Sequence, residues 1–193
     1  MHFKELIKMK LYYIDQRKLF SFMQPVEVWD EQGNVRYRLK SECTIGYHLH
    51  LLTPYDEEVA SIRQKLLTMV PKFIVKVNGK ELAVSLKHPL NDSEYCTVTD
   101  LNWKTEGFLK YRTYQITAED QQIAKVQMVE FSKGRKDALY ESLKKIAHVP
   151  ESALSQGNCC EIDFSDDLNE AEILAVVMAI EAVLCIDSSS SSA

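Results

Sequence analysis

Three basic residues alternate with apolar ones in one short segment of the chain. Arg36, Arg38 and Lys40 are each separated by one residue, and a β-strand points every second side chain to the same face. Such a row spaces its cations about 6.6 to 7 Å apart, and guanidinium groups bind phosphate through paired hydrogen bonds. The spacing predicts a strand face that can bind a polyphosphate; the alternative is an ordinary solvated face. The opposite face would carry Val35, Tyr37 and Leu39.

Lys110 and Arg112 repeat this spacing on a smaller scale, and we include them among the candidate ligand-binding residues. Lys72 and Lys76, which flank Ile74, form a further basic stretch of the same kind. No recognised motif includes these residues, so a solvated surface stays the alternative interpretation of each.

Two histidines have a spacing that could place both side chains near one metal ion. His48 and His50 flank Leu49, so on a strand both imidazoles point to the same side. Zinc sites in proteins need at least three protein ligands. Two histidines without a third ligand do not make a site, and we expect ordinary surface histidines. The sequence therefore predicts no metal and no cofactor.

The chain lacks the short motifs that position catalytic or phosphate-binding groups. It contains no G-x-S-x-G, H-E-x-x-H, Walker or G-x-G-x-x-G sequence. Its net charge of −5 argues against the basic surface that is typical of nucleic-acid binding. We therefore expect a protein that is not an enzyme and does not bind nucleic acid.

The elements that must position these side chains are short β-strands. Between residues 8 and 130, β-rich runs alternate with turn signals, of which Asn78-Gly79 is the strongest because both residues tolerate positive φ. An open sheet of about ten or more strands would leave edges that invite aggregation, so closure is favoured. The pattern predicts a mainly β domain of the α+β class, closed into an antiparallel barrel.

Residues 170–187 predict a helix that is apolar almost all round, preceded by acidic and capping residues. Only about 14 consecutive residues are apolar and Glu181 interrupts them, whereas about 20 are needed to cross a bilayer. The helix is therefore expected to lie in the barrel lumen and not to span a membrane. There Glu181 needs a hydrogen-bond donor or a basic residue on the inner wall, which is a structural role. Residues 188–193 are expected to be a disordered tail.

Residues 137–158 interrupt the strand pattern. Apolar residues recur there at helical spacing until Pro150, which ends the helix. This helical insertion supports an alternative hypothesis, a protein-protein interaction module that acts through residues 138–154. Its contact residues would be Tyr140, Leu143 and Ile146.

The chain resembles the LURP-one-related family, which shares the tubby-like C-terminal fold with tubby proteins and phospholipid scramblases. The densest similarity is Ile62-Arg-Gln-Lys-Leu-Leu-Thr-Met-Val-Pro-Lys-Phe-Ile-Val-Lys-Val-Asn-Gly-Lys-Glu-Leu-Ala83, and the terminal helix with its single acid is also similar. The resemblance implies one domain, residues 1–187, in which about twelve strands close around a central C-terminal helix. The chain departs from the family pattern at the insertion, residues 138–154. The matching motifs are structural, so they specify the fold better than an activity.

Tubby proteins bind phosphoinositide headgroups through basic residues, although no tubby lipid-binding motif aligns with this chain. The resemblance and the Arg36 to Lys40 row together favour a non-catalytic binding or scaffold domain for anionic phospholipid headgroups. Five cysteines, an odd number without motif-like spacing, are typical of reduced thiols, and the N-terminal residues show no export signal. We therefore expect a cytoplasmic protein, peripheral at the membrane if the lipid hypothesis holds. The sequence predicts no oligomeric state.

Overall fold

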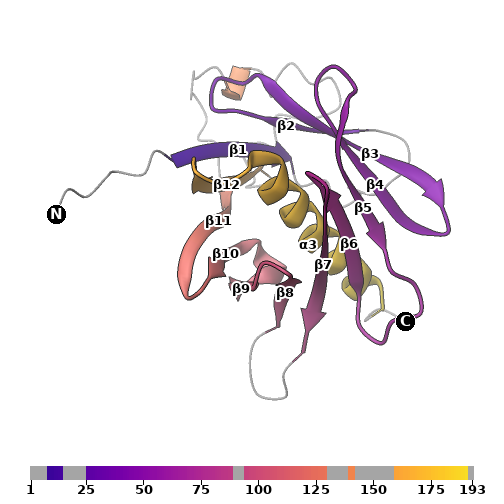
Figure 1. Ribbon diagram of the computed structural model, residues 1–193. Coiled ribbons are helices and arrows are strands. Elements are labelled where there is room, and N and C mark those ends of the chain that lie inside the picture. The colour runs from indigo at the N-terminus through magenta and orange to yellow at the C-terminus, as the bar shows by residue number, and fades with distance from the viewer. Residues whose placement is uncertain (1–7, 15–24, 89–93, 130–138, 142–158, 191–193) are drawn as a thin grey trace.

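The computed structural model describes residues 8–14, 25–88, 94–129, 139–141 and 159–190 (Figure 1). In these residues, twelve strands form one closed antiparallel barrel, and a C-terminal helix lies inside it. The predicted fold class is confirmed. The elements are β1 (Lys8–Ile14), β2 (Val26–Trp29), β3 (Val35–Thr44), β4 (Gly46–Leu52), β5 (Glu58–Gln64), β6 (Lys72–Val77), β7 (Lys80–Lys87), β8 (Tyr95–Thr99), β9 (Trp103–Phe108), the 3-10 helix η1 (Leu109–Tyr111), β10 (Thr113–Ala118), β11 (Gln121–Val129), β12 (Cys159–Ser165) and α3 (Glu170–Ser190).

Each strand pairs with its neighbours in sequence, and β1 closes the barrel by pairing with β12. Consecutive strands run in opposite directions, so the connections alternate between two ends of the barrel. We call one end the turn end, which carries the connections after even-numbered strands: 30–34, 53–57, 78–79, 100–102 and 119–120. The other is the loop end, which carries those after odd-numbered strands, among them 45, 65–71 and 109–112.

The barrel wall alternates between buried and exposed residues because one of its faces lines the lumen. In β6, Phe73 and Val75 are buried, whereas Lys76 is exposed on the outer face. The helix α3 fills the lumen, and every residue from Ile173 to Ile180 is fully buried. A helix that is apolar on all sides is stable in water only when it is enclosed in this way. Among the helices of the described residues, none is long and apolar enough to cross a membrane.

The helix α3 begins at the turn end, directly after β12. Asn169 is its N-cap, because the Asn169 Oδ1 accepts a hydrogen bond from the backbone N–H of Glu172 at 2.9 Å. Glu170 and Glu172 lie in the first turn, where carboxylates are favoured by the helix dipole. Both also bind the wall, Glu170 through Arg36 and Glu172 through Lys80. These contacts fix the start of the helix against the barrel rim.

The helix ends later than the sequence predicts. Residues 188–190, which were expected to belong to a disordered tail, continue α3 as far as Ser190. The apolar run ends at Ile186, but a serine run has only a modest helix penalty and can extend a helix that is already formed. Residues 191–193 lie outside the described residues.

Part of the predicted helical insertion is described. Residues 139–141 are helical, whereas 137, 138 and 142–158 lie outside the described residues. Leu139 and Tyr140 are buried in a cluster with Tyr12, Trp29 and other residues of the outer wall. The expectation that Tyr140 faces a partner is therefore wrong, because its side chain already covers apolar residues of the barrel itself. Leu143 and Ile146 lie outside the described residues.

Candidate functional site

The predicted row of cations on β3 is divided by a β-bulge. Val28 of β2 pairs with Tyr37, but the next residue, Trp29, pairs with Val35, so Arg36 is an extra residue on β3. Tyr37 accordingly packs on the lumen core, whereas Val35 packs on the outer cluster with Trp29. The expectation that Val35, Tyr37 and Leu39 share one face is wrong for this physical reason, and Arg36 is separated from the other two cations.

Each of these three cations has an acidic partner. The Arg36 guanidinium binds Glu170 at 3.1 Å, and that carboxylate raises the pKa of Arg36. Lys40 binds Asp56 at 2.8 Å. Arg38 lies 3.6 Å from Glu27 and 4.0 Å from the same Asp56. The row is therefore largely neutralised within the fold and offers little free charge to a phosphate.

Lys110 and Arg112 point to different surroundings. Lys110 belongs to η1 and its Nζ lies 3.5 Å from Glu94, with its side chain largely exposed. Arg112 has a left-handed backbone (φ 49°), and its Nε donates a hydrogen bond at 2.8 Å to Glu181 in the lumen. The two residues do not form one binding surface, and Arg112 serves the interior of the barrel.

Glu181, the acid within the apolar helix, binds both a hydroxyl and a guanidinium group of the barrel wall. It is completely buried, and its carboxylate accepts hydrogen bonds from Arg112 and from the Tyr13 hydroxyl at 3.1 Å. Burial, together with the nearby Glu181 charge, raises the pKa of Tyr13 well above its ordinary value, so the hydroxyl keeps its proton. Wall and helix are thus joined by a buried ion pair near the loop end.

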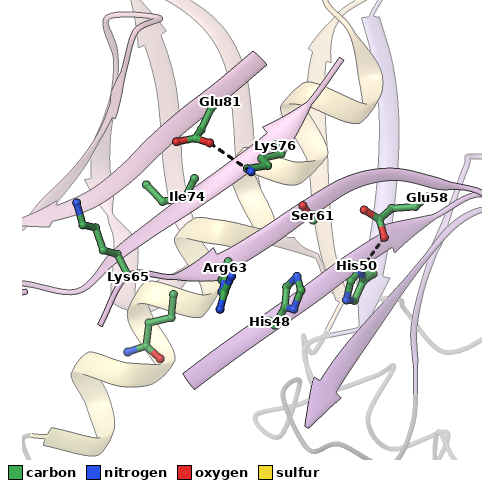
Figure 2. A pocket seen from close by; sticks show the side chains of 10 residues that line it. His48, His50, Glu58, Ser61, Arg63, Lys65, Ile74, Lys76 and Glu81 are labelled. Carbon is green, nitrogen blue, oxygen red and sulfur yellow. Dashed lines mark hydrogen bonds and ion pairs between the residues drawn. The ribbon is translucent and has the colours of Figure 1, made fainter. Parts of the chain in front are cut away.

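The outer wall over β4, β5, β6 and β7 carries a pocket of about 640 Å³ (Figure 2). Sequence reasoning missed it as a site, because its side chains come from separate strands that only the register brings together. Within the described residues, no acid lies within ion-pair distance of Arg63 or Lys65, both of which are exposed. The lining consists of His48, His50, Glu58, Ser61, Arg63, Gln64, Lys65, Ile74, Lys76 and Glu81.

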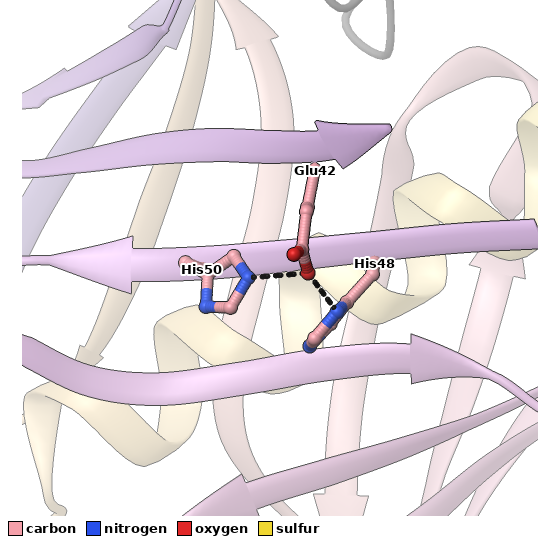
Figure 3. A group of neighbouring side chains, drawn as sticks. All are labelled: Glu42, His48 and His50. Atoms are coloured by element: carbon pink, nitrogen blue, oxygen red, sulfur yellow. Dashed lines mark hydrogen bonds and ion pairs between the residues drawn. The ribbon is translucent and has the colours of Figure 1, made fainter. Parts of the chain in front are cut away.

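The two histidines have a third neighbour that the sequence did not reveal. Glu42 of β3 pairs in register with His48 of β4, and its carboxylate lies 2.6 Å from His48 Nδ1 and 3.4 Å from His50 Nε2 (Figure 3). These hydrogen bonds, His50 first, lower the pKa of Glu42. A hairpin centred on Ile45 would have predicted this register, since it places Glu42 three residues before the turn and His48 three after it.

The loop end exposes apolar side chains next to Arg63 and Lys65. Leu67 and Met69, in the loop between β5 and β6, are exposed completely, and Ile45 is 88% exposed in the β3–β4 turn. The two connections are neighbours, because a Cβ on Gly46 would lie 2.9 Å from the Leu66 side chain. We call Ile45, Leu66, Leu67 and Met69 the apolar tip; Arg63 and Lys65 lie next to it.

Comparison with known proteins finds a family and a distant relative. The sequence model of the family described as LURP-one-related matches residues 11–181. An uncharacterised protein of Bacillus subtilis (strain 168), YxjI, is 22% identical over 103 residues, which is 53% of this chain. The match spans 64% of that relative's length. The match therefore supports relatedness, and because YxjI is itself uncharacterised it suggests no activity for this chain.

Proposed function

Because this chain belongs to the LURP-one-related family and its barrel lumen is filled by its own helix, we propose that it is a non-catalytic binding domain. We propose further that it docks onto anionic membrane surfaces through the apolar tip at the loop end. The observation that carries this proposal is the pair of fully exposed apolar side chains, Leu67 and Met69, beside cations that have no acidic partner in the described part of the chain.

The helix α3 occupies the lumen of the barrel, which directs the search for a binding surface to the outside. Narrow barrels are filled by side chains or hold one small ligand, and here α3 is fully buried from Ile173 to Val183. Contiguous exposed apolar groups on a monomer are uncommon and mark contact sites for proteins or membranes. Ile45, Leu67 and Met69 are such groups, and they protrude from two neighbouring connections instead of lining a groove.

The charges around the tip favour an anionic membrane over an apolar protein surface. Arg63 and Lys65 stand immediately before the exposed loop, and each basic residue near an anionic bilayer contributes about 1 kcal/mol of attraction. Apolar groups that enter the headgroup region add to this electrostatic term. Phe108 and Tyr111 are also exposed at the loop end, and aromatic rings favour the membrane interface.

Vesicle co-sedimentation of the full chain tests the proposal. Wild type should bind phosphatidylcholine vesicles that contain phosphatidylserine, bind pure phosphatidylcholine less, and lose binding as salt is added. The double variant Leu67→Ser/Met69→Ser should bind at least about tenfold more weakly, because it removes two side chains that would enter the interface. Tyr55→Ser is the matched control, since Tyr55 is 87% exposed at the opposite, turn end. A control that loses as much binding as the double variant contradicts the assignment to the tip.

Charge variants separate the two rows of cations. Arg63→Gln/Lys65→Gln should weaken binding up to roughly 30-fold, about 1 kcal/mol for each charge. Arg38→Gln/Lys40→Gln should have little effect, because those cations already bind Glu27 and Asp56. Vesicles with a phosphoinositide, matched in total charge, distinguish a specific headgroup from charge alone. Wild type that binds none of these vesicles would reject the membrane proposal and leave a protein partner for the tip.

A further inference from the structure

Two imidazoles and one carboxylate converge on the outer face of β3 and β4 (Figure 3). His48 and His50 project from the same side of β4, and Glu42 reaches them from β3. One ligand atom from each residue lies within 4.8 Å of the other two. The side chains are partly exposed, so an ion can reach them from solvent.

We propose that Glu42, His48 and His50 form a binding site for a divalent transition-metal ion of the zinc class. Imidazole nitrogen and carboxylate oxygen are ligands that Zn²⁺ takes at about 2.0 to 2.2 Å, so two ligand atoms of a tetrahedral site lie about 3.4 Å apart. The separation between His50 Nε2 and Glu42 Oε2 is 3.4 Å. The 2.6 Å contact between His48 and Glu42 would lengthen on binding, which the half-exposed Glu42 side chain permits.

A second observation points to the same ligand set. The other ring nitrogen of His50, Nδ1, lies 2.7 Å from the carboxylate of Glu58 on β5. In metal sites, a ligating histidine commonly donates its second N–H to a carboxylate, which fixes the tautomer and the ring orientation. In the proposed site, Glu58 accepts the Nδ1–H of His50, and Nε2 is the nitrogen that binds the metal.

The surrounding charges are compatible with a cation that keeps an open coordination position. The two imidazole rings lie 4.3 Å apart, so both can reach the same ion. Glu42 and Glu58 supply two negative charges. Arg63 lies opposite His48 in register. Its positive charge would repel the metal ion but would attract an anionic fourth ligand from the pocket. Three protein ligands leave the fourth position of a tetrahedral zinc ion open to water or to such an anion.

Titration calorimetry with Zn²⁺ on the metal-free, tag-free full chain tests the site. Wild type should bind one equivalent, and His48→Gln/His50→Gln should abolish this binding. Glu58→Gln should weaken it about 10- to 100-fold, the usual effect of removing a carboxylate that orients a ligating histidine. His88→Gln is the matched control, because His88 is also a surface histidine paired with a glutamate, at 3.2 Å from Glu94, but lies away from the cluster.

Cobalt spectroscopy distinguishes this site from binding by cysteine. Co²⁺ added to the wild type should give visible bands without the near-ultraviolet absorption of a metal–thiolate bond, since the proposed ligands are nitrogen and oxygen. No Zn²⁺ binding by the wild type, equal loss in His88→Gln, or full binding by Glu42→Gln would each overturn the three-ligand site. Circular dichroism melting should show that the variants remain folded. The site uses none of the apolar-tip residues, so vesicle binding and metal binding can fail separately.

Discussion

At the turn end of the barrel, most left-handed backbone positions are occupied by residues that tolerate them, among them Asp56 (φ 63°), Asn78 (φ 51°), Asp100 (φ 77°) and Asn102 (φ 52°); Glu119 (φ 49°) is the exception. At the loop end, the left-handed position between β5 and β6 is Leu67, with φ 58° and a completely exposed side chain. A left-handed conformation costs an ordinary residue roughly 1 to 2 kcal/mol, and an exposed leucine regains none of this through burial. Most left-handed positions of the turn end carry residue types that this backbone favours, whereas Leu67 at the loop end is a residue that folding alone does not explain.

Arg112 is the informative exception at the loop end. It too has a left-handed backbone, but its side chain enters the wall and binds Glu181. Strain at Arg112 is thus offset by a buried contact, and strain at Leu67 is not. Left-handed residues at the loop end thus differ in whether the side chain makes a stabilising contact. The following variants test this difference, beginning with the largest expected effect.

Arg112→Ala should be the most destabilising of these changes. It leaves the Glu181 carboxylate buried without its guanidinium partner, a situation that costs about 3 to 5 kcal/mol. Lys80→Ala is the control at the turn end, because the Lys80–Glu172 pair also joins helix and wall but is about half exposed on the lysine side. Its loss should cost about 1 kcal/mol or less. Urea unfolding measures both, and equal losses would show that the buried pair has no special role.

Gly107→Ala and Gly79→Ala compare glycines at the two ends. A Cβ on Gly107 (φ 117°) would lie 2.7 Å from the Thr113 carbonyl oxygen, whereas a Cβ on Gly79 (φ 73°) would meet nothing within 4 Å. Gly107→Ala should therefore cost about 3 kcal/mol through clash and strain, and Gly79→Ala about 1 kcal/mol through strain alone. Thermal melting that ranks them in the opposite order would contradict this account of the loop-end wall.

Asn169→Ala removes the N-cap that starts α3 at the turn end. The backbone N–H of Glu172 loses its acceptor, and such a change costs about 1 kcal/mol. Asn169→Asp should retain most of the stability, because its carboxylate can accept the same hydrogen bond. If Asn169→Ala and Asn169→Asp unfold at the same urea concentration, the cap does not stabilise the helix.

Glu161→Gln should change how stability depends on pH. Burial tends to raise the pKa of Glu161, but hydrogen bonds from Tyr12 and Gln127 and the charge of Lys10 outweigh it, so the pKa is lowered. A lowered pKa stabilises the fold above the unfolded value, about 4.3, and the contribution is lost as pH falls through the folded value. Wild type should exceed the variant by about 1 kcal/mol at neutral pH, and the difference should shrink below about pH 4. A constant difference at all pH values would contradict the role of this carboxylate.

Leu67→Asn should have the smallest effect on stability. Asparagine tolerates a left-handed backbone, so the free energy of unfolding should stay within about 0.5 kcal/mol or rise slightly. Vesicle binding should fall at the same time, because an apolar group is lost from the tip. A clear loss of stability would show that Leu67 serves the fold and would remove the contrast between the two ends.

Much of the fold follows from local patterns in the sequence. Alternating polarity marks the strands, and the continuous apolar run around Glu181 requires an enclosed helix with a polar partner. The identity of that partner, Arg112, could not be predicted, because a left-handed residue after η1 directs it into the lumen. Lys110, two residues earlier, has the same charge and a different environment.

The candidate sites depend on register, which the sequence specifies poorly. Strand alternation correctly groups Arg38 with Lys40, which share Asp56, but a bulge displaces Arg36 toward Glu170. Glu42 joins the histidines only through pairing across the β3–β4 hairpin. Arg63 and Lys65, which have no acidic partner among the described residues, were missed because no spacing along the chain distinguishes a paired cation from an unpaired one.

The position of α3 after the last strand has a consequence for synthesis on the ribosome. Strands β1 and β12, which close the barrel, are separated by about 150 residues, and the helix that fills the lumen emerges after both. During translation, the apolar inner faces of all twelve strands are therefore made before the helix that covers them. Contacts between distant residues slow folding, and exposed strand edges favour aggregation in the interval. We expect the nascent chain to need protection by chaperones until Glu170 and the residues after it have left the exit tunnel.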